Sequence, residues 1–214
     1  MEKKAIMSAE EAWLLGLVIG DGHVNVYFVE ISDRFKENLI FAKSVIEMLG
    51  FDAKITRDNR ENRYRLWVNS RKFVEKLHRL GYVSTMSVPK TIINCEDSKI
   101  IHAFIRGLYD AEGYVENWRP RGMMRINFSN KSKEIIDFIA KILRSLGIKP
   151  YLRYSSKAYR IQIYRKQDVH KFLQEIGFSY PSKLGRITPT ASRSGRLKLK
   201  GIGGGAPQGV DVAA

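Results

Sequence analysis

Apolar residues along the chain alternate between two periodicities. In residues 135–146 isoleucine and leucine recur three and four positions apart, which is typical of the buried face of a helix, and Gly147 suits a left-handed helix end. Residues 53–68 and 150–164 instead alternate apolar and polar side chains, which predicts two-stranded hairpins. Their expected turns are Asp58-Asn59 and Ser155-Ser156.

The order of these elements occurs twice. Residues 31–49, ISDRFKENLIFAKSVIEML, match residues 128–146, FSNKSKEIIDFIAKILRSL, and the repeat period is roughly 90 to 97 residues. Each copy is predicted as helix, strands, helix, hairpin and helix, with glycine after the second and third helices. The expected division is a first half (8–82), a linker (83–98), a second half (99–183) and a flexible, basic and glycine-rich tail (184–214), which either contacts nucleic acid or has no role.

Each copy opens with a related segment, AWLLGLVIGDG at 12–22 and AFIRGLYDAEG at 103–113. The alignment pairs Gly16 with Gly107, Gly20 with Ala111, and Asp21 with Glu112. Small residues four apart line one face of a helix and allow two backbones to approach closely. We therefore expect the two helices to pack about a pseudo-twofold axis. Their predicted N-terminal caps are Ser8, in a capping box with Glu11, and Asp97 or Ser98.

Such packing would place Asp21 and Glu112 side by side at the ends of both helices. A carboxylate at a helix C-terminus is unfavourable, and two like charges in one site repel each other. A cation would offset both effects, and hard divalent cations favour carboxylate and carbonyl oxygens. The alternative is that both acids are ordinary turn residues before glycine, but their presence in register in two copies weighs against it.

Charge and composition indicate an anionic partner. Among 214 residues, Lys and Arg exceed Asp and Glu by 37 to 22, which gives a formal charge of +15. Clustered cations favour nucleic acid because they release condensed counterions from phosphates. The alternative of a membrane surface fits less well, because the cations do not lie on one amphipathic helix. The single cysteine, Cys95, excludes an internal disulfide framework and a multi-cysteine zinc site.

Location can be predicted from what the sequence lacks. No segment has the roughly 18 to 20 apolar residues needed to cross a bilayer. The N-terminal residues lack the pattern of a secretory signal. We expect an intracellular protein, in the cytoplasm, nucleoid or an organelle matrix, that is not secreted.

Both opening segments resemble the LAGLIDADG motif, and residues 8–180 resemble the monomeric, two-motif LAGLIDADG homing endonucleases. The resemblance implies an α+β fold in which each half has an αββαββα plan, the motif helices form the interface, and the antiparallel sheets form a saddle over DNA. It also implies a monomeric, sequence-specific endonuclease that hydrolyses both strands of double-stranded DNA across the minor groove with Mg²⁺. The products would carry short 3′ overhangs, Mn²⁺ could replace Mg²⁺, and Ca²⁺ is expected to support binding without cleavage.

The resemblance also assigns roles to particular residues. It implies that Asp21 and Glu112 bind the metal together with the carbonyls of Gly20 and Ala111. It implies that Arg34 and Lys131 are supporting catalytic cations, although they could instead be solvated residues at a helix start. Asp33 and Asn130 precede these cations where the family often carries Gln, and Ile19 replaces an acid of the consensus that Asp110 keeps.

Sequence recognition is expected from the concave sheet face. Strand alternation assigns Ile55, Leu66, Val68, Leu152, Ile161 and Ile163 to the core. The predicted DNA contacts are Lys54, Thr56, Arg63, Arg65, Trp67, Arg121, Arg125, Asn127, Asn130, Tyr151, Arg153, Arg160, Gln162 and Tyr164. Arg, Gln and Thr suit base edges and the other cations suit phosphates. Any one of them could instead be a solvated strand residue. The first hairpin of the first half must be short, because only residues 24–32 are available for it.

Two alternative functions share this scaffold. One is an RNA maturase that assists splicing of its own intron, an activity of some family members. The other is a regulator that binds DNA without cutting it, although the presence of both acids argues against it. An intact protein-splicing element is not expected, because the chain lacks an N-terminal Cys or Ser nucleophile and a C-terminal His-Asn.

Overall fold

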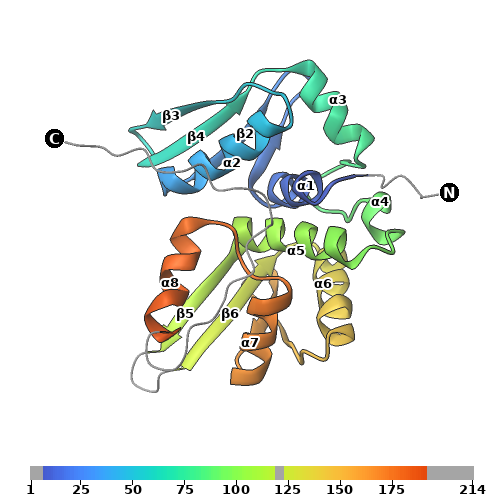
Figure 1. Ribbon diagram of the computed structural model, residues 1–214, viewed down its shortest axis with the longest axis vertical. Helices are drawn as coiled ribbons and strands as arrows, with labels where there is room; N and C mark the ends of the chain where they lie inside the picture. The colour runs from blue at the N-terminus through green and yellow to red at the C-terminus, as the bar shows by residue number, and fades with distance from the viewer. Residues whose placement is uncertain (1–6, 119–122, 192–214) are drawn as a thin grey trace.

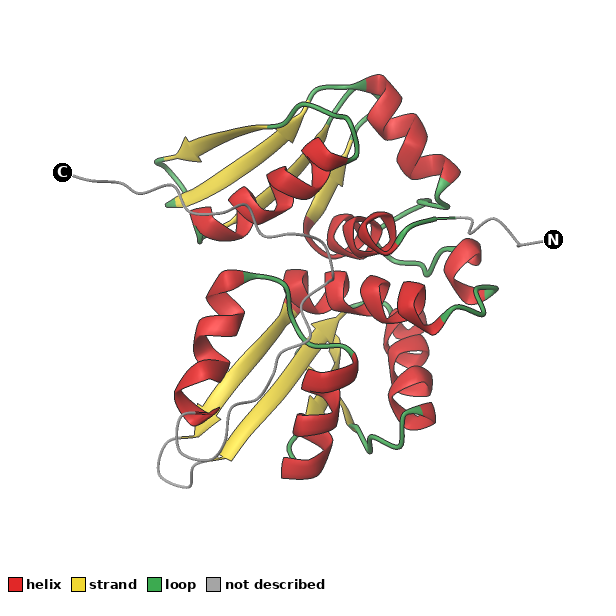
Figure 2. Ribbon diagram, in the orientation of Figure 1, coloured by secondary structure: helices red, strands yellow, loops and turns green. Residues whose placement is uncertain are grey.

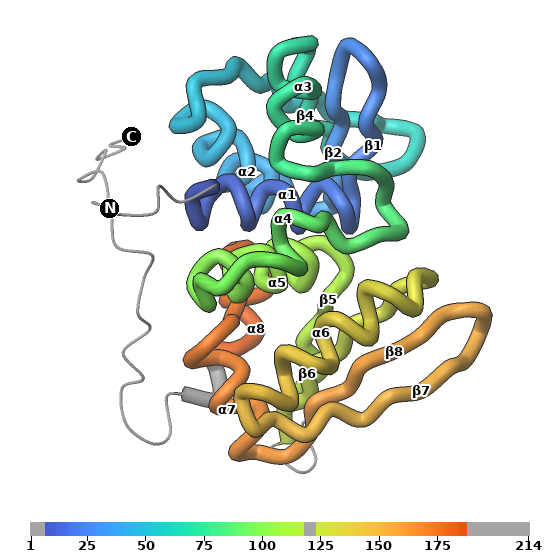
Figure 3. Tube along the Cα trace, turned by 90° about the vertical axis from the view of Figure 1, so that its right-hand side faces the viewer, coloured from blue at the N-terminus to red at the C-terminus, as the bar shows by residue number. Residues whose placement is uncertain are grey.

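The computed structural model describes residues 7–118 and 123–191 as two similar halves, one above the other in Figure 1. Each half contains one four-stranded antiparallel sheet, with helices packed on one face of it (Figure 2). The first helix of each half lies at the middle of the molecule, and the two run side by side there (Figures 1 and 3). Within the described residues, no helix combines the length and apolarity needed to span a membrane.

Both halves follow the αββαββα order that the repeat predicts. The first comprises α1 (Ala9–Asp21), β1 (Gly22–Val24), β2 (Val29–Asp33), α2 (Lys36–Met48), β3 (Lys54–Asp58), β4 (Arg63–Val68) and α3 (Arg71–Arg79). The second comprises α5 (Ser98–Glu112), β5 (Gly113–Trp118), β6 (Met123–Asn130), α6 (Lys133–Ser145), β7 (Tyr151–Ser155), β8 (Ala158–Ile163) and α7 (Lys166–Glu175). The strand orders are also equivalent, β1-β2-β4-β3 and β5-β6-β8-β7.

The helix ends have the predicted local chemistry. Ser8 caps α1 in a complete capping box with Glu11, and the side chain of Asp97 caps α5. Gly50 and Gly147 follow α2 and α6 with φ of 83° and 73°, a region that glycine enters without a Cβ clash. The sequence therefore predicts these boundaries through short-range interactions alone.

The interface between α1 and α5 depends on glycine. A Cβ atom at Gly16 would lie 2.1 Å from the carbonyl oxygen of Phe104, and one at Gly107 would lie 2.0 Å from that of Trp13. Both distances are far below van der Waals contact, so each glycine lets the backbone of the facing helix approach directly. The predicted close packing of the two motif helices is confirmed.

The inner faces of the sheets agree with the predicted alternation in all but one position. Leu66, Val68, Ile161 and Ile163 are fully buried, and Ile55 packs against the core. The prediction for Leu152 is wrong, because its side chain is 37% exposed. It lies on β7, one of the two edge strands of the second sheet, where alternation still holds but coverage of the inner face is incomplete.

Two helices lie outside the repeat. The linker contains α4 (Lys90–Ile93), and the chain continues beyond the second half as α8 (Pro181–Ala191). A flexible tail from residue 184 is therefore corrected over residues 184–191, and the prediction for 192–214 lies outside the described residues. Helix α8 contacts both halves, since Ser182 exchanges two hydrogen bonds with Asn38 of α2 and Arg186 donates to Val115 of β5.

Candidate active site

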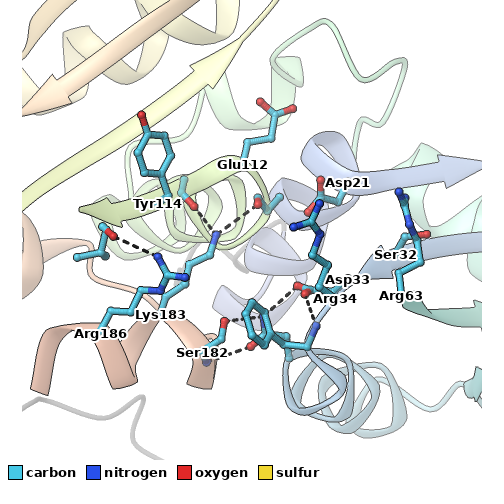
Figure 4. Close-up of a pocket in the computed structure, with 15 residues that line it drawn as sticks. Asp21, Ser32, Asp33, Arg34, Arg63, Glu112, Tyr114, Ser182, Lys183 and Arg186 are labelled. Atoms are coloured by element: carbon cyan, nitrogen blue, oxygen red, sulfur yellow. Dashed lines mark hydrogen bonds between the residues drawn. The ribbon is translucent and has the colours of Figure 1, made fainter. Parts of the chain in front are cut away.

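Asp21 and Glu112 are the last residues of α1 and α5, and the interface brings these two helix ends together. A Cβ atom at Gly20 would lie 2.3 Å from the Cβ atom of Ala111 and 3.6 Å from the Cγ atom of Glu112. Both acids line a pocket of about 700 Å³ (Figure 4), and both also line a second pocket of about 640 Å³. The two acids predicted from the matched motifs thus share one site.

The surroundings of the two acids disfavour their ionised forms. Desolvation by the surrounding protein raises the pKa of Asp21 from 3.8 to about 6. The charge of Lys183 lowers this pKa, the charge of Asp33 raises it, and that of Arg63 lowers it. Burial raises the pKa of Glu112 from 4.5 to about 7, and the charge of Asp21 adds a smaller increase. A neighbouring carboxylate raises the pKa of an acid, and a cation beside it lowers that pKa. A bound cation would therefore stabilise the ionised forms of both acids.

Asn130 holds the Glu112 carboxylate. Its Nδ2 atom donates to both carboxylate oxygens at 3.0 Å, and its Oδ1 atom accepts from the backbone of Ser132 at 2.7 Å. With only 6% of its surface exposed, Asn130 is turned away from solvent. The prediction that it contacts DNA is corrected, because it points to the opposite face of β6 from Asn127. In the first half the equivalent residue is Asp33, which cannot donate to Asp21 in this way.

A cation from outside the repeat lies at the end of α5. The Nζ atom of Lys183, on α8, donates to the carbonyl oxygens of Tyr109 at 2.8 Å, Gly113 at 2.6 Å and Ala111 at 3.3 Å, and also to that of Asp110. An ammonium group at a helix C-terminus offsets the partial negative charge of its carbonyls. Burial lowers the pKa of Lys183, and the nearby carboxylates oppose this. Sequence reasoning missed this residue, which carries no motif signal.

Arg34 and Lys131 lie on opposite sides of the acids. Each occupies the short turn between the second strand and second helix of its half, and neither lies within a helix. Arg34 lines the first pocket, with Arg63 also in its wall, and Lys131 lines the second. Both predicted cations therefore lie beside the paired carboxylates, one in each half.

The protein alone supplies a partial set of metal ligands. Within residues 7–118 and 123–191, no three His, Cys, Asp or Glu side chains come together as a metal site. Asp21 and Glu112 nevertheless provide two carboxylates beside helix-terminal carbonyls, which is oxygen chemistry that suits Mg²⁺ or Mn²⁺. Mg²⁺ in particular binds through one or two carboxylates and completes its shell with water and substrate phosphates. The residues therefore fit a metal that is shared with a phosphate-containing substrate.

The predicted contact residues other than Asn130 and Arg121 share the outer faces of the two sheets. The strand registers pair Thr56 with Arg65, Lys54 with Trp67, and Arg153 with Arg160, so these side chains point away from the helices. We call this set the outer sheet surface; it consists of Lys54, Thr56, Arg63, Arg65, Trp67, Arg125, Asn127, Tyr151, Arg153, Arg160 and Gln162, with the exposed Tyr164 directly after β8. Asn127 lies on this face but is only 5% exposed, and its Oδ1 atom accepts a hydrogen bond from Gln162 at 2.9 Å. Arg121 lies outside the described residues.

Some members of this surface are already engaged within the protein. Arg65 forms ion pairs with Glu30 at 3.0 Å, Asp58 at 2.6 Å and Glu61 at 3.4 Å. Arg65 is therefore held in place by three acids, whose negative charges exceed its single positive charge. Sequence patterns predict the face on which a cation lies but not such partners.

The acid at the sixth position of the second motif, Asp110, is buried and hydrogen-bonded. Asp110 accepts a hydrogen bond from Trp13 Nε1 at 2.8 Å, and also accepts from the backbone N–H groups of Ser179 and Tyr180. It therefore ties α1 to the segment that leads into α8. The equivalent Ile19 of the first half is buried in the core. Burial raises the pKa of Asp110, and its hydrogen bonds oppose this.

Comparisons with known proteins agree with this geometry. The model of the LAGLIDADG-like domain family matches residues 8–81 and again 99–177. The chain is 29% identical to the homing endonuclease I-ApeI of Aeropyrum pernix over 203 residues, covering 89% of this chain and 90% of that protein. It is 26% identical to the homing endonuclease I-DmoI of Desulfurococcus mucosus over 201 residues, covering 86% and 95%.

A solved structure is similar in fold. The crystal structure of I-DmoI in complex with DNA and Mn matches with a TM-score of 0.58 and 25% sequence identity, covering 79% of this chain and 96% of that chain. The duplicated α+β arrangement expected from the sequence is confirmed.

Proposed function

Because the chain belongs to the LAGLIDADG-like family, we propose that it is a homing endonuclease, a site-specific enzyme that cuts both strands of double-stranded DNA with a divalent metal. The observation that carries this proposal is the pairing of Asp21 and Glu112 at the adjoining ends of α1 and α5. Mg²⁺ is the expected ion, and monomeric action is expected because one chain holds both halves.

The two acids would hold the metal, together with the helix-terminal carbonyls beside them. A bound divalent metal activates water and stabilises negative charge on a phosphate during hydrolysis. Asn130 keeps the Glu112 carboxylate oriented, and its two hydrogen bonds favour the ionised form that a metal needs. Arg34 and Lys131 lie where each can attract a phosphate toward the acids.

The outer sheet surface would bind the DNA. It presents arginine, lysine, glutamine and tyrosine side chains from both halves, and the whole chain carries a formal charge of +15. Arginine and glutamine recognise base edges in the major groove, while further cations contact phosphates. A surface of this composition supports recognition of a specific sequence as well as general attraction to DNA.

The deciding experiment is selection of cleaved sequences from a randomised DNA library with Mg²⁺. The selected site is then used to compare the wild type with Asp21→Asn and Glu112→Gln. Both variants are expected to lose cleavage of the site while binding it in Ca²⁺ with little change. Glu96→Gln is a matched control, because Glu96 is an exposed acid in the linker. The proposal fails if no site is selected, or if both acid variants cut as the wild type does.

The maturase alternative remains a prediction that no observation favours. Splicing of a precursor RNA in the presence of the protein would test it directly. Loss of DNA cleavage in the Asp21→Asn variant with retained splicing would separate the two activities.

A further inference from the structure

The ends of α1 and α5 differ in one respect that the repeat does not predict. At the end of α5 the Lys183 ammonium donates to three carbonyl oxygens of the last turn, including that of Ala111, and to the carbonyl oxygen of Gly113, the first residue of β5. Among residues 7–118 and 123–191, no side-chain cation donates to the carbonyl of Gly20, the matching position on α1. Figure 4 shows Lys183 reaching into the pocket between the two halves, with hydrogen bonds to carbonyls of the second half.

The difference arises because α8 has no counterpart in the first half. Ser182, which precedes Lys183, bonds to Asn38, and the backbone N–H of Tyr180, three residues before Lys183, donates to Asp110, so the chain leading into Lys183 is anchored. The lysine side chain is therefore directed at α5 by a fixed backbone. It is not a surface side chain free to swing into solvent.

This placement affects a metal that uses the Ala111 carbonyl. An ammonium group that donates to a carbonyl oxygen occupies part of its acceptor capacity, and two cations bound to one carbonyl repel each other. The Gly20 carbonyl has no such competitor in the described structure. Lys183 therefore adds a difference between the two matched metal positions before any substrate arrives.

We propose that Lys183 competes with the divalent metal for the end of α5, so that the two halves bind metal with unequal affinity. The inference rests on the proposed function only in assuming that these carbonyls and acids bind metal. It adds a positioning residue from outside the repeat, and it predicts that the two DNA strands are cut at unequal rates.

Mn²⁺ binding to the full-length protein without DNA tests the proposal, measured by electron paramagnetic resonance of the free ion. The wild type is expected to show a tighter and a weaker site. Lys183→Met removes the competing ammonium and should tighten the weaker site about tenfold, equivalent to about 1.4 kcal/mol, while changing the tighter site less. Lys183→Gln, which keeps one donor for a carbonyl but no charge, should tighten it to a smaller extent and serves if the methionine variant does not fold.

Arg186→Met is the matched control, because Arg186 also lines the first pocket from α8 but donates to Val115 rather than to α5. An equal gain in Arg186→Met and Lys183→Met would show a general charge effect and overturn the competition. Unchanged or weaker Mn²⁺ binding in both Lys183 variants would also overturn it. In either case, loss of Mn²⁺ binding in Asp21→Asn or Glu112→Gln would leave the proposed function standing. If neither acid variant changes Mn²⁺ binding, the proposed metal site itself fails.

Discussion

Replacing Glu112 with Gln should stabilise the metal-free protein at high pH. The pKa of Glu112 rises from 4.5 to about 7 on folding, so holding its charge in the folded state costs up to about 3 kcal/mol. Because the side chain is only partly buried, solvent screening reduces this to about 1–3 kcal/mol. Glutamine has nearly the same shape and can still accept one hydrogen bond from Asn130, so the charge is the main change.

The pH dependence gives the sign of this effect. Below pH 4.5 Glu112 is neutral in both the folded and the unfolded chain, so the substitution removes no unfavourable charge. As the pH rises through 7 the folded protein must ionise the acid, and the wild type loses stability that the variant keeps. The advantage of Glu112→Gln should therefore be largest at pH 8 and below about 1 kcal/mol at pH 5.

Urea unfolding in EDTA at pH 5 and pH 8 measures this difference. Glu96→Gln is the control, and as a surface substitution it should change the free energy of unfolding by less than about 0.5 kcal/mol at either pH. A Glu112→Gln variant that is less stable than the wild type at pH 8, or equally shifted at both pH values, would refute the argument. Adding Mg²⁺ should then stabilise the wild type more than the variant, because only the wild type holds both carboxylates.

Three further predictions follow from the interface, the acid and the charge. Gly107→Ala should cost about 3 kcal/mol or more in thermal or urea unfolding, because its Cβ atom would meet the Trp13 carbonyl oxygen at 2.0 Å; Gly185→Ala, with no atom within 4 Å in helix α8, should instead be neutral or stabilising, and equal effects would contradict the interface. Asn130→Ala removes the bonds that lower the pKa of Glu112, so the acidic limb of the pH–cleavage profile should move to higher pH, and an unmoved limb would exclude the role of Asn130. DNA affinity should fall steeply with salt, with a log–log slope near −0.9 for each phosphate neutralised, and a flat response would contradict electrostatic binding.

The sequence predicts the parts of this molecule that depend on short-range patterns or on duplication. Helical spacing and helix-ending glycines predict the helices, and strand alternation predicts the hairpins of both sheets. The matched motifs predict that Asp21 and Glu112 meet. Once two copies are recognised, a residue in one half predicts the place of its equivalent in the other. This argument needs no knowledge of distant contacts.

The residues that were missed depend on contacts between distant parts of the chain. Lys183 is the last residue of the predicted second half, at the border of the predicted basic tail, and nothing in the first half matches it. The bond between Trp13 and Asp110 joins residues of different halves. The prediction for Asn130 failed for a local reason. A shift of one position along β6 decides whether a side chain faces the outer surface or the core.

The unequal hairpins have a consequence for the DNA that such a molecule can recognise. Strands β1 and β2 pair over three positions, whereas β5 and β6 pair over six. Three extra rungs at about 3.3 Å per residue extend the second sheet by about 10 Å, which is the length of about three base pairs. A DNA site recognised by this protein would then be asymmetric, with a longer half-site on one side of its centre. Because both halves of the protein are encoded in a single chain, the sequence preference of one half can change without altering the other, and a palindromic target is not required.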